Sequence, residues 1–314
     1  MFCTVDPSVR IFFVHWILIA LSSAAVSAFV SISDKTVIYR YAHSSLTLPL
    51  LIGLSHTIVG MIVIASVGIP DPLPASAIAA AILSGILFGF SGFISQRVLF
   101  TQEVSRTVPI TQSAPIFTAI LAIPLLGESI SAVQWAGIIT TVIGSATLSL
   151  RVTPGVSRLF LHHSFYLLMF SSLFLGCSNV IAKIALNQLP VLFTHGIREL
   201  ALAQTLLALT FRKIPWNEVR GYFRRRSPAL IFVGINEFFT ANLGLILFLL
   251  ALSKGPAALV LGLIGTRAMF VVLYSTVLAL VWRGALGEEI SFVTVCAKGL
   301  SVVLIVFGVI AIAL

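Results

Sequence analysis

The stretch Ser113-Ala114-Pro115-Ile116-Phe117 continues through an apolar run to Leu126-Gly127-Glu128, and another apolar segment follows it. A second version of this pattern occurs later in the chain. It consists of Thr266-Arg267-Ala268-Met269-Phe270, an apolar run, Leu286-Gly287-Glu288 and the final apolar segment. The two versions predict that the chain contains two copies of one structural unit.

The beginning of each copy carries a second matching feature. Lys35 follows Ser23 by 12 residues, and Lys183 follows Ser171 by the same 12 residues. In both places the serine belongs to a Ser-Ser pair inside an apolar run. The similarity therefore extends over about half of the chain and is not confined to one short motif.

The composition identifies the class of protein. Of the 314 residues, 59% are hydrophobic and only 9% are charged, whereas about a quarter of the residues of a soluble domain are charged. We therefore expect an integral membrane protein. The net charge of +9 indicates anionic lipid headgroups rather than nucleic acid, because the cations lie between apolar spans. The three cysteines are far apart, and the sequence predicts no metal site and no cofactor.

Ten apolar runs have about the 20 residues that a helix needs to cross a bilayer. They divide the chain into a first repeat (1–150), a linker (151–163) and a second repeat (164–314). Because each repeat has an odd number of spans, the second repeat is predicted to be inverted across the membrane. The predicted spans are 11–33, 46–68, 77–99, 106–126, 130–150, 164–184, 190–211, 228–252, 256–282 and 291–314.

The basic residues favour one side of the membrane by thirteen to three. By the positive-inside rule this side is cytoplasmic, and both termini then lie outside. We expect a multi-pass protein of the plasma membrane, which in a bacterium is the inner membrane. The cations on the basic side are Lys35, Arg40, Arg97, Arg106, Arg151, Arg158, Arg212, Lys213, Arg220, Arg224, Arg225, Arg226 and Arg283, and those on the other side are Arg10, Lys183 and Lys254.

The first motif, from Val108-Pro109 to Gly144 with Gln134-Trp135-Ala136-Gly137 inside it, resembles the EamA repeat of the drug/metabolite transporter superfamily. The second copy, from residue 251 to Gly308, is less similar and has Ala268 in place of the proline. The resemblance implies a carrier of ten helices, with a central cavity lined by helices 1–4 and 6–9 and with helices 5 and 10 outside.

The resemblance also implies a secondary transporter, in the direction of export, of a small metabolite such as an amino acid or organic anion. Transport would proceed by alternating access of the two inverted repeats, with the proton as the coupling ion. Alternatives are an intramembrane lipid-modifying enzyme and a flippase of lipid-linked intermediates. We do not expect an enzyme, because the sequence shows no clustered acid, base or nucleophile. The sequence also contains no Walker A motif, so we do not expect transport to be driven by ATP.

The Leu-Gly-Glu motif itself has a structural explanation. Gly127 is suited to the left-handed conformation that ends a helix. Glu128, Ser129 or Ser131 then serves as a cap for the helix that follows, and Glu288, Glu289 and Ser291 are placed to do the same in the second copy.

Charges inside the predicted spans occur almost only in the second repeat. A charge at the bilayer centre costs at least about 2.5–3.5 kcal/mol, so such a residue normally faces a cavity or a partner. The charged or titratable residues in question are His195, Arg198, Glu199, Glu237, Arg267 and Lys298. The candidate substrate-binding residues are Arg267, Arg198, Glu237, Asn236, Gln112, Gln96, Thr266 and Asn179, and the candidates for proton coupling are Glu237 and Glu199.

Structural explanations for these residues stay open beside the functional ones. Glu237 could form an ion pair with Arg267 or Arg198 that only holds helices together. His56 and His195 are interpreted as hydrogen-bonded packing residues. Lys35 and Lys183 are expected to extend to the headgroups. The spacing of Gly85 and Gly89 allows close helix packing and leaves a homodimer open.

Overall fold

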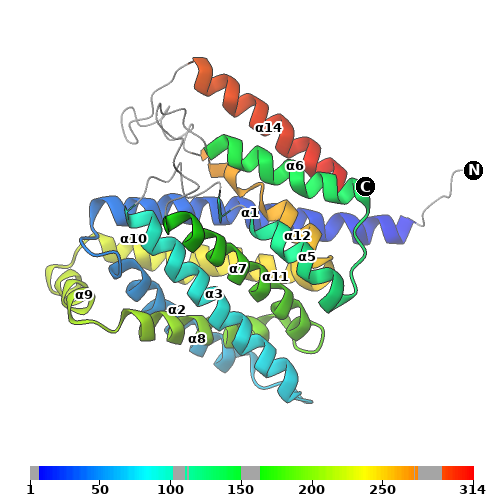
Figure 1. Ribbon diagram of the computed structural model, residues 1–314. Helices are drawn as coiled ribbons and strands as arrows, with labels where there is room; N and C mark the ends of the chain where they lie inside the picture. Colours follow the sequence, from blue (N-terminus) through cyan, green and yellow to red (C-terminus); the bar gives the residue numbers. More distant parts are fainter. Residues whose placement is uncertain (1–6, 102–109, 112, 150–162, 272, 275–291) are drawn as a thin grey trace, which may run out of the picture.

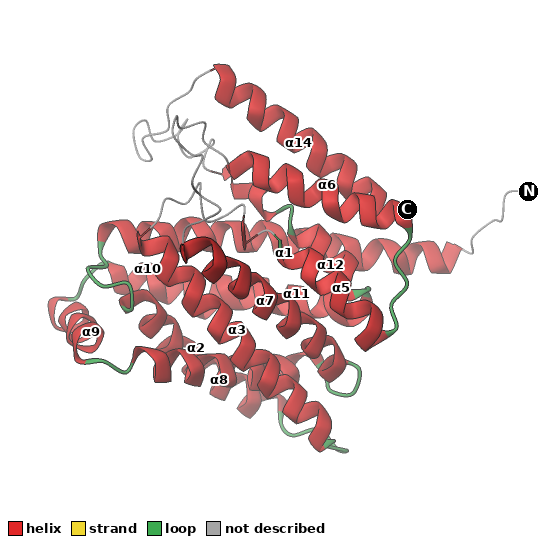
Figure 2. Cartoon of the chain, in the orientation of Figure 1, coloured by secondary structure: helices red, strands yellow, loops and turns green. Residues whose placement is uncertain are grey.

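The computed structural model describes residues 7–101, 110–111, 113–149, 163–271, 273–274 and 292–314, and all regular secondary structure in these ranges is helical (Figures 1 and 2). The first half contains α1 (Pro7–Arg40), α2 (Thr47–Val67), α3 (Ala75–Thr101), α5 (Ala114–Leu126) and α6 (Ala132–Ser149). The second half contains α7 (His163–Leu186), α8 (Val191–Thr210), α9 (Lys213–Arg225), α10 (Ala229–Ile235), η2 (Asn236–Thr240), α11 (Ala241–Lys254), α12 (Ala257–Ile264) and α14 (Phe292–Ala313).

Five helical stretches are long and apolar enough to cross a membrane. The predicted spans at 106–126, 130–150, 256–282 and 291–314 coincide with shorter apolar helices in the described residues, and the span at 190–211 coincides with α8. The count of ten spans thus stays a prediction.

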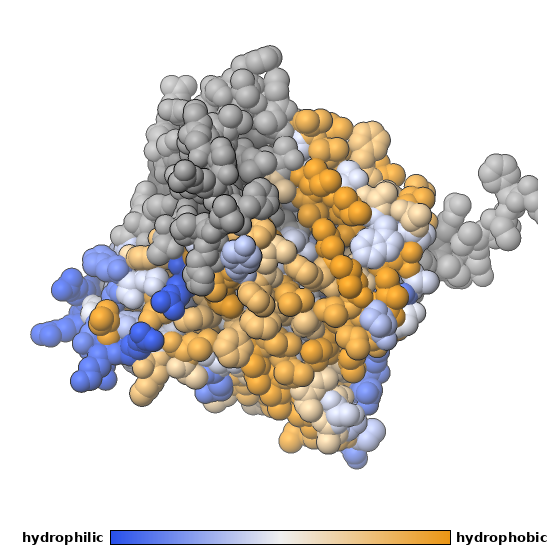
Figure 3. Space-filling view, in the orientation of Figure 1, coloured by the Kyte–Doolittle hydropathy of each residue, from blue (hydrophilic) through white to orange (hydrophobic). Residues whose placement is uncertain are grey.

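Many large apolar side chains, among them Ile62, Phe170 and Phe307, are exposed, and apolar surface covers the middle of the molecule in Figure 3. The chain is an integral, multi-pass membrane protein. The five long stretches are His15–Asp34, Thr47–Val67, Ala75–Val98, Ser164–Leu186 and Ala229–Lys254.

The helices pack mainly across the two halves of the chain. The most extensive contacts are those of α2 with α8, of α6 with α14 and of α3 with α7, and α1 lies along α11 and α12. In Figure 1, α6 and α14 lie side by side at one edge of the bundle, away from α2 and α8. The polar residues discussed below lie on α1, α2, α3, α8 and the α10–α12 region.

Matching serines join matching helix pairs. Ser23 on α1 donates a hydrogen bond of 2.8 Å to the carbonyl of Gly244 on α11. Ser171 on α7 donates one of 2.9 Å to the carbonyl of Ser91 on α3. Both serines are almost fully buried. Each bond therefore ties the first helix of one half to a helix of the other half.

The Leu-Gly-Glu motif ends α5 as predicted, but its glutamate caps a different helix. Gly127 has a φ of +67° in the left-handed region, and its N–H bonds back to the end of α5. Glu128, however, accepts the N–H groups of Ala257 and Ala258 at 2.6 and 3.3 Å, and so caps α12 in the second half. Gln134 and Ser131 bond to each other's backbone N–H and cap α6. The corresponding caps Glu288, Glu289 and Ser291 lie outside the described residues.

Lys183 does not extend to the headgroups as the sequence suggested. Its ammonium group donates to the carbonyls of Leu252 and Gly255 at 2.5 and 3.0 Å. These carbonyls lie at the end of α11, where helical partners are missing and the helix dipole is negative. The sequence could not predict this contact, because the acceptors lie about 70 positions later, at the C-terminal end of α11, and only the fold brings them beside Lys183. The side chain of Lys35 lies outside the described residues.

The basic segment after α8 forms a helix that the span analysis did not predict. Helix α9 buries Pro215 and Val219 and is fixed to the α1–α2 connection through Glu218. This carboxylate accepts the N–H of His43 at 2.7 Å, the hydroxyl of Thr47 at 2.5 Å and the hydroxyl of Tyr222 at 2.6 Å. Burial and the adjacent Glu218 raise the pKa of Tyr222 above its ordinary value, so its hydroxyl remains a donor. The anchored helix lies at one end of the bundle (Figure 1).

The glycine pair in α3 is used inside the chain. A Cβ added at Gly85 would lie 2.4 Å from the carbonyl oxygen of Arg198, and one at Gly89 would lie 2.8 Å from Thr205. Both neighbours belong to α8. The absence of these side chains therefore allows α3 to approach α8, and the pair needs no second copy of the chain to explain it.

Candidate functional site

A π-helical segment interrupts the helix between α10 and α11. It comprises Asn236–Thr240, and π turns of this kind are common at functional sites. The segment buries the side chains of Asn236 and Glu237. Asn242 follows at the start of α11 and donates its amide to the carbonyl of Glu237. The altered helix therefore places an amide and a carboxylate inside the bundle.

His56 on α2 lies between two carboxylates. Its Nδ1 is hydrogen bonded to Glu199 on α8, and its Nε2 lies 3.0 Å from Oε2 of Glu237. All three side chains are at most 3% exposed. We call these residues the His56 triad. It joins α2 of the first half to α8 and η2 of the second half.

The contacts of both ring nitrogens of His56 limit the hydrogen bonds that the triad can form. A neutral imidazole has one N–H and one lone pair. Because both ring nitrogens of His56 contact a carboxylate, the three groups must share two protons. They form either an imidazolium between two carboxylates or a neutral imidazole with one protonated carboxyl group. Removing one proton would leave a ring lone pair facing a carboxylate lone pair. The arrangement is therefore the one that a protonated triad would adopt.

His195 extends the His56 triad into a wider set of polar contacts, which we call the network. Its Nδ1 lies 3.5 Å from Oε1 of Glu199, one turn further along α8. Its Nε2 lies 3.0 Å from Oδ1 of Asn242, which in turn donates to the carbonyl of Glu237. A continuous series of polar contacts thus runs from α2 to α8, on to α11 and back to the π-helical segment.

Asp34 extends the network to α1. Its Oδ1 accepts the amide of Asn236 at 2.9 Å, and the same amide donates to Glu237 at 2.8 Å. Its Oδ2 lies 3.4 Å from Nε2 of Gln96 on α3. Asp34 and Glu237 are therefore linked through one shared amide.

Arg267 lies beside this extension. Its Nε and Nη2 both donate to the hydroxyl of Ser31 on α1, the Nε at 2.8 Å. It also interacts electrostatically with Asp34. Since Ser31 is a neutral partner, the planar guanidinium keeps donors available for an anionic group.

Arg198 points away from its neighbour Glu199, as adjacent residues on a helix must. Its Nη2 donates to Ser178 on α7 at 3.2 Å. Its guanidinium lies 4.5 Å from the ring centre of Phe88 and 5.8 Å from that of Phe248. This is a cation–π contact inside the bundle, and it places Arg198 outside the His56 triad.

Two helices are interrupted at equivalent positions of the sequence motif. Ser113 precedes α5, and its hydroxyl donates to the carbonyl of Ile110 at 2.7 Å. Thr266 follows α12, and its hydroxyl donates to the carbonyl of Leu263 at the same 2.7 Å. In each case the acceptor lies three residues earlier. The first residue after each interruption is Ala114 in one copy and Arg267 in the other.

The structure brings together only part of the predicted set. Glu237, Glu199, Asn236, Gln96 and Arg267 lie in or beside the network. Arg198 contacts α7, and Asn179 is buried with an unpaired Nδ2. The hydroxyl of Thr266 donates a hydrogen bond to the carbonyl of Leu263, three residues earlier. Gln112 and the side chain of Lys298 lie outside the described residues. In the described residues Glu237 contacts His56 and Asn236, and not Arg267 or Arg198, with which an ion pair was the structural alternative.

Two members of the network were missed. Asp34, which directly follows the apolar run 11–33, was not among the predicted residues, and His56 was interpreted as a packing residue. One signal could have found Asp34: it is an acidic residue adjoining a predicted span in a chain with only 10 Asp and Glu in total. For His56 the sequence gives no comparable signal, since both carboxylate partners lie more than 140 positions away.

Several polar atoms around the network have no hydrogen-bond partner among the described residues. They are Oε1 of Gln96, Oδ1 of Asn236, Nδ1 of His195, Nε of Arg198 and Nδ2 of Asn179. An unpaired buried polar atom costs about 1–3 kcal/mol. These groups would therefore favour the approach of a ligand that carries both donors and acceptors.

Comparison with known proteins gives one family match and a similar solved structure. Residues 14–150 match the EamA-like transporter family, and the match ends where we predict the first repeat to end. No curated protein matches the sequence. A solved structure described as "Crystal structure of protein" aligns with a TM-score of 0.68 at 14% identity, over 95% of this chain and 96% of that chain. At this identity the likeness shows the fold alone.

Proposed function

We propose, from the match of residues 14–150 to the EamA-like transporter family, that this chain is a proton-coupled secondary transporter of a small metabolite. The substrate is an amino acid or organic anion, and the direction is export. The observation that carries the proposal is the His56 triad, a buried group of two carboxylates and one imidazole in mutual contact.

Three observations support two inverted repeats, 1–150 and 164–314, as its architecture. The bonds of Ser23 and Ser171 join equivalent helices. The interruptions at Ser113 and Thr266 have equal local bonding. The packing of α1 on α11 corresponds to that of α7 on α3. Broken helices at the repeat interface are where transporters of this kind bind substrate.

The charges around the triad explain how a proton would be coupled. Within the His56 triad, Glu199 and Glu237 are two carboxylates on either side of the imidazole of His56. An imidazolium there would place one positive charge between two negative charges. When its proton leaves, the two carboxylates lose this compensating charge in a medium of low dielectric. A positive group must then replace the proton, or the contact between His56 and one carboxylate must open.

An amino acid carries both a cation for the carboxylates of the triad and an anion for Arg267. Its ammonium group could replace the proton at the carboxylates of the triad, and its carboxylate could accept the fork of donors of Arg267. An organic anion would use Arg267 alone. The competition between a proton and the substrate's cation is the basis of antiport, in which one leaves as the other binds.

The orientation follows from the distribution of cations. Under the positive-inside rule the end that carries α9 faces the cytoplasm of a bacterium, and both termini lie outside. The pathway then alternates between the α9 end and the opposite end of the bundle, by movement of one repeat against the other around the triad.

The proposal is tested in proteoliposomes with labelled amino acids and organic acids. We expect uptake of at least one amino acid that is driven by an imposed pH gradient and abolished by a protonophore. Conversion of the substrate into a new product without translocation would instead indicate an enzyme. Movement of a lipid-linked substrate between the leaflets, with no movement of soluble metabolites, would indicate a flippase.

A further inference from the structure

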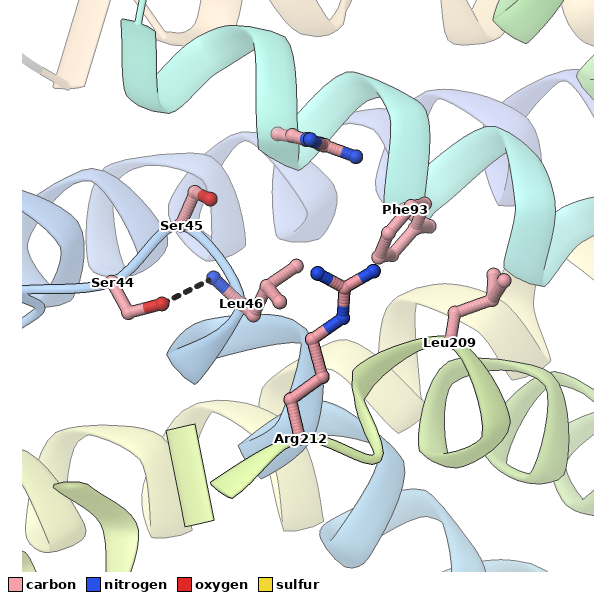
Figure 4. A pocket seen from close by; sticks show the side chains of 7 residues that line it. Ser44, Ser45, Leu46, Phe93, Leu209 and Arg212 are labelled. Carbon is pink, nitrogen blue, oxygen red and sulfur yellow. Dashed lines mark hydrogen bonds between the residues drawn. The ribbon is translucent and has the colours of Figure 1, made fainter. Parts of the chain in front are cut away.

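A pocket of about 210 Å³ lies at the end of the molecule that carries α9. Two arginines from different elements line it, Arg97 from α3 and Arg212 from the α8–α9 connection. Figure 4 shows Arg212 reaching from that connection toward Phe93 on α3. The complete lining of this arginine pocket is Ser44, Ser45, Leu46, Phe93, Arg97, Leu209 and Arg212.

The lining has the chemistry of a phosphate site. Arg97 and Arg212 provide planar forks of N–H donors that match phosphate oxygens, and Ser44 and Ser45 provide hydroxyl groups. The hydroxyl oxygen of Ser44 accepts the N–H of Leu46 at 3.3 Å, so its O–H remains directed elsewhere. The lining contains no acidic residue, and neither arginine has an ion pair with a carboxylate in the described part of the chain.

The surroundings indicate the source of the phosphate. Both arginines are exposed, while Phe93, Leu46 and Leu209 give the pocket an apolar wall. Helix α9 begins directly after Arg212, and Phe211 and Ile214 beside it are 80% and 74% exposed. Figure 3 shows hydrophilic side chains gathered over α9, next to the apolar surface of the bundle. A basic amphipathic helix with exposed aromatic and aliphatic residues is typical of the lipid–water interface.

We propose that the arginine pocket binds the phosphate of an anionic phospholipid, with the headgroup between Arg97 and Arg212 and the acyl chains along the apolar surface. Free phosphate would satisfy the arginines equally, but it would gain nothing from Phe93, Leu209 and the exposed residues at the start of α9. The lipid would link α3 to the α8–α9 connection. The proposal is independent of the transported substrate.

The test is thermal unfolding of the delipidated protein in detergent with added lipid. We expect phosphatidylglycerol to raise the unfolding temperature more than phosphatidylcholine, and inorganic phosphate at the same concentration to have little effect. In the Arg97→Gln/Arg212→Gln variant the extra effect of phosphatidylglycerol should disappear. The control Arg220→Gln/Arg225→Gln, which removes the same charge from α9 outside the pocket, should keep it.

Three results would overturn the proposal: equal stabilisation by the two lipids, a full effect of inorganic phosphate alone, or retention of the phosphatidylglycerol effect in the pocket variant. Should the double variant not fold, Arg97→Gln alone decides the question. Native mass spectrometry should then show phosphatidylglycerol binding weakened by roughly tenfold, because each charge-assisted hydrogen bond contributes about that factor. Unchanged lipid binding in this variant would contradict the proposal.

Discussion

His56 and Glu237 lie 3.0 Å apart, Nε2 to Oε2, although one belongs to the first half of the chain and the other to the second. The other ring nitrogen of His56 contacts Glu199 in the second half as well. The contact between the halves therefore includes three titratable side chains. A change in protonation would act directly on the packing of α2 against α8 and η2.

The first prediction concerns the stability of the triad. Glu199→Ala leaves a buried imidazolium with one partner fewer, and breaking a buried ion pair in this way costs about 3–5 kcal/mol. Glu199→Gln keeps an acceptor and should cost less. Thermal unfolding in detergent should rank wild type above Glu199→Gln and Glu199→Gln above Glu199→Ala. The control His43→Gln, at a histidine whose side chain is 87% exposed, should unfold like wild type. Equal unfolding temperatures for all four proteins would contradict the structural role of the triad.

The second prediction concerns substrate recognition. Arg267→Gln removes the guanidinium fork beside Asp34, and one hydrogen bond to a charged group is worth about 1.5–3 kcal/mol. The KM for an amino acid should therefore rise by roughly tenfold to a hundredfold. Arg220→Gln on α9 is the matched control and should leave KM unchanged. A normal KM in Arg267→Gln would remove Arg267 from the substrate site.

The third prediction concerns the cap that Glu128 provides to α12. Glu128→Ala leaves the N–H groups of Ala257 and Ala258 without their carboxylate, at an expected cost of about 1–2 kcal/mol. The variant should unfold at lower temperature and keep the KM of wild type. Glu128→Gln should show a smaller loss because the amide oxygen still accepts. If instead Glu128→Ala changes KM at full stability, the residue has a role in transport.

The fourth prediction concerns the glycines of α3. A Cβ at Gly85 meets the carbonyl oxygen of Arg198 at 2.4 Å, so Gly85→Ala should destabilise the protein by about 1–3 kcal/mol through overpacking. Gly92 on the same helix has no neighbour within 4 Å, and Gly92→Ala should be neutral or stabilising. Light scattering should show the same particle mass for both. A lower particle mass for Gly85→Ala alone would show that the glycines serve a dimer interface.

The sequence predicted several spans well where hydropathy decides them. The predicted span 46–68 corresponds to the helix Thr47–Val67, and the predicted span 77–99 corresponds to the helix Ala75–Thr101. Helix α9 was missed because its amphipathic, basic sequence is too polar to span a membrane. The π-helical segment at Asn236–Thr240 was also missed, since no residue in it breaks an apolar helix and its form is set by surrounding partners.

The site could be predicted only from its charges. Glu237, Glu199 and Arg267 were identified because an ion in an apolar span is costly. Their partners were not identified, because pairing depends on which helices lie together. Thus Glu237, for which an ion pair with an arginine was one alternative, lies beside His56, and Glu128 was expected to cap the next helix and caps α12. Asp34, at the edge of its apolar run, belongs to the network and was not among the predicted residues.

Proton coupling by the His56 triad is tested most directly by the ratio of protons to substrate that move across the membrane of proteoliposomes. The two are followed with a trapped pH-sensitive dye and a labelled amino acid. Wild type should move protons in fixed proportion to substrate. His56→Gln cannot hold the shared proton between Glu199 and Glu237, so it should exchange substrate across the membrane without proton movement, while His43→Gln keeps the wild-type ratio. The wild-type ratio in His56→Gln, with substrate transport intact, would contradict proton coupling by the His56 triad.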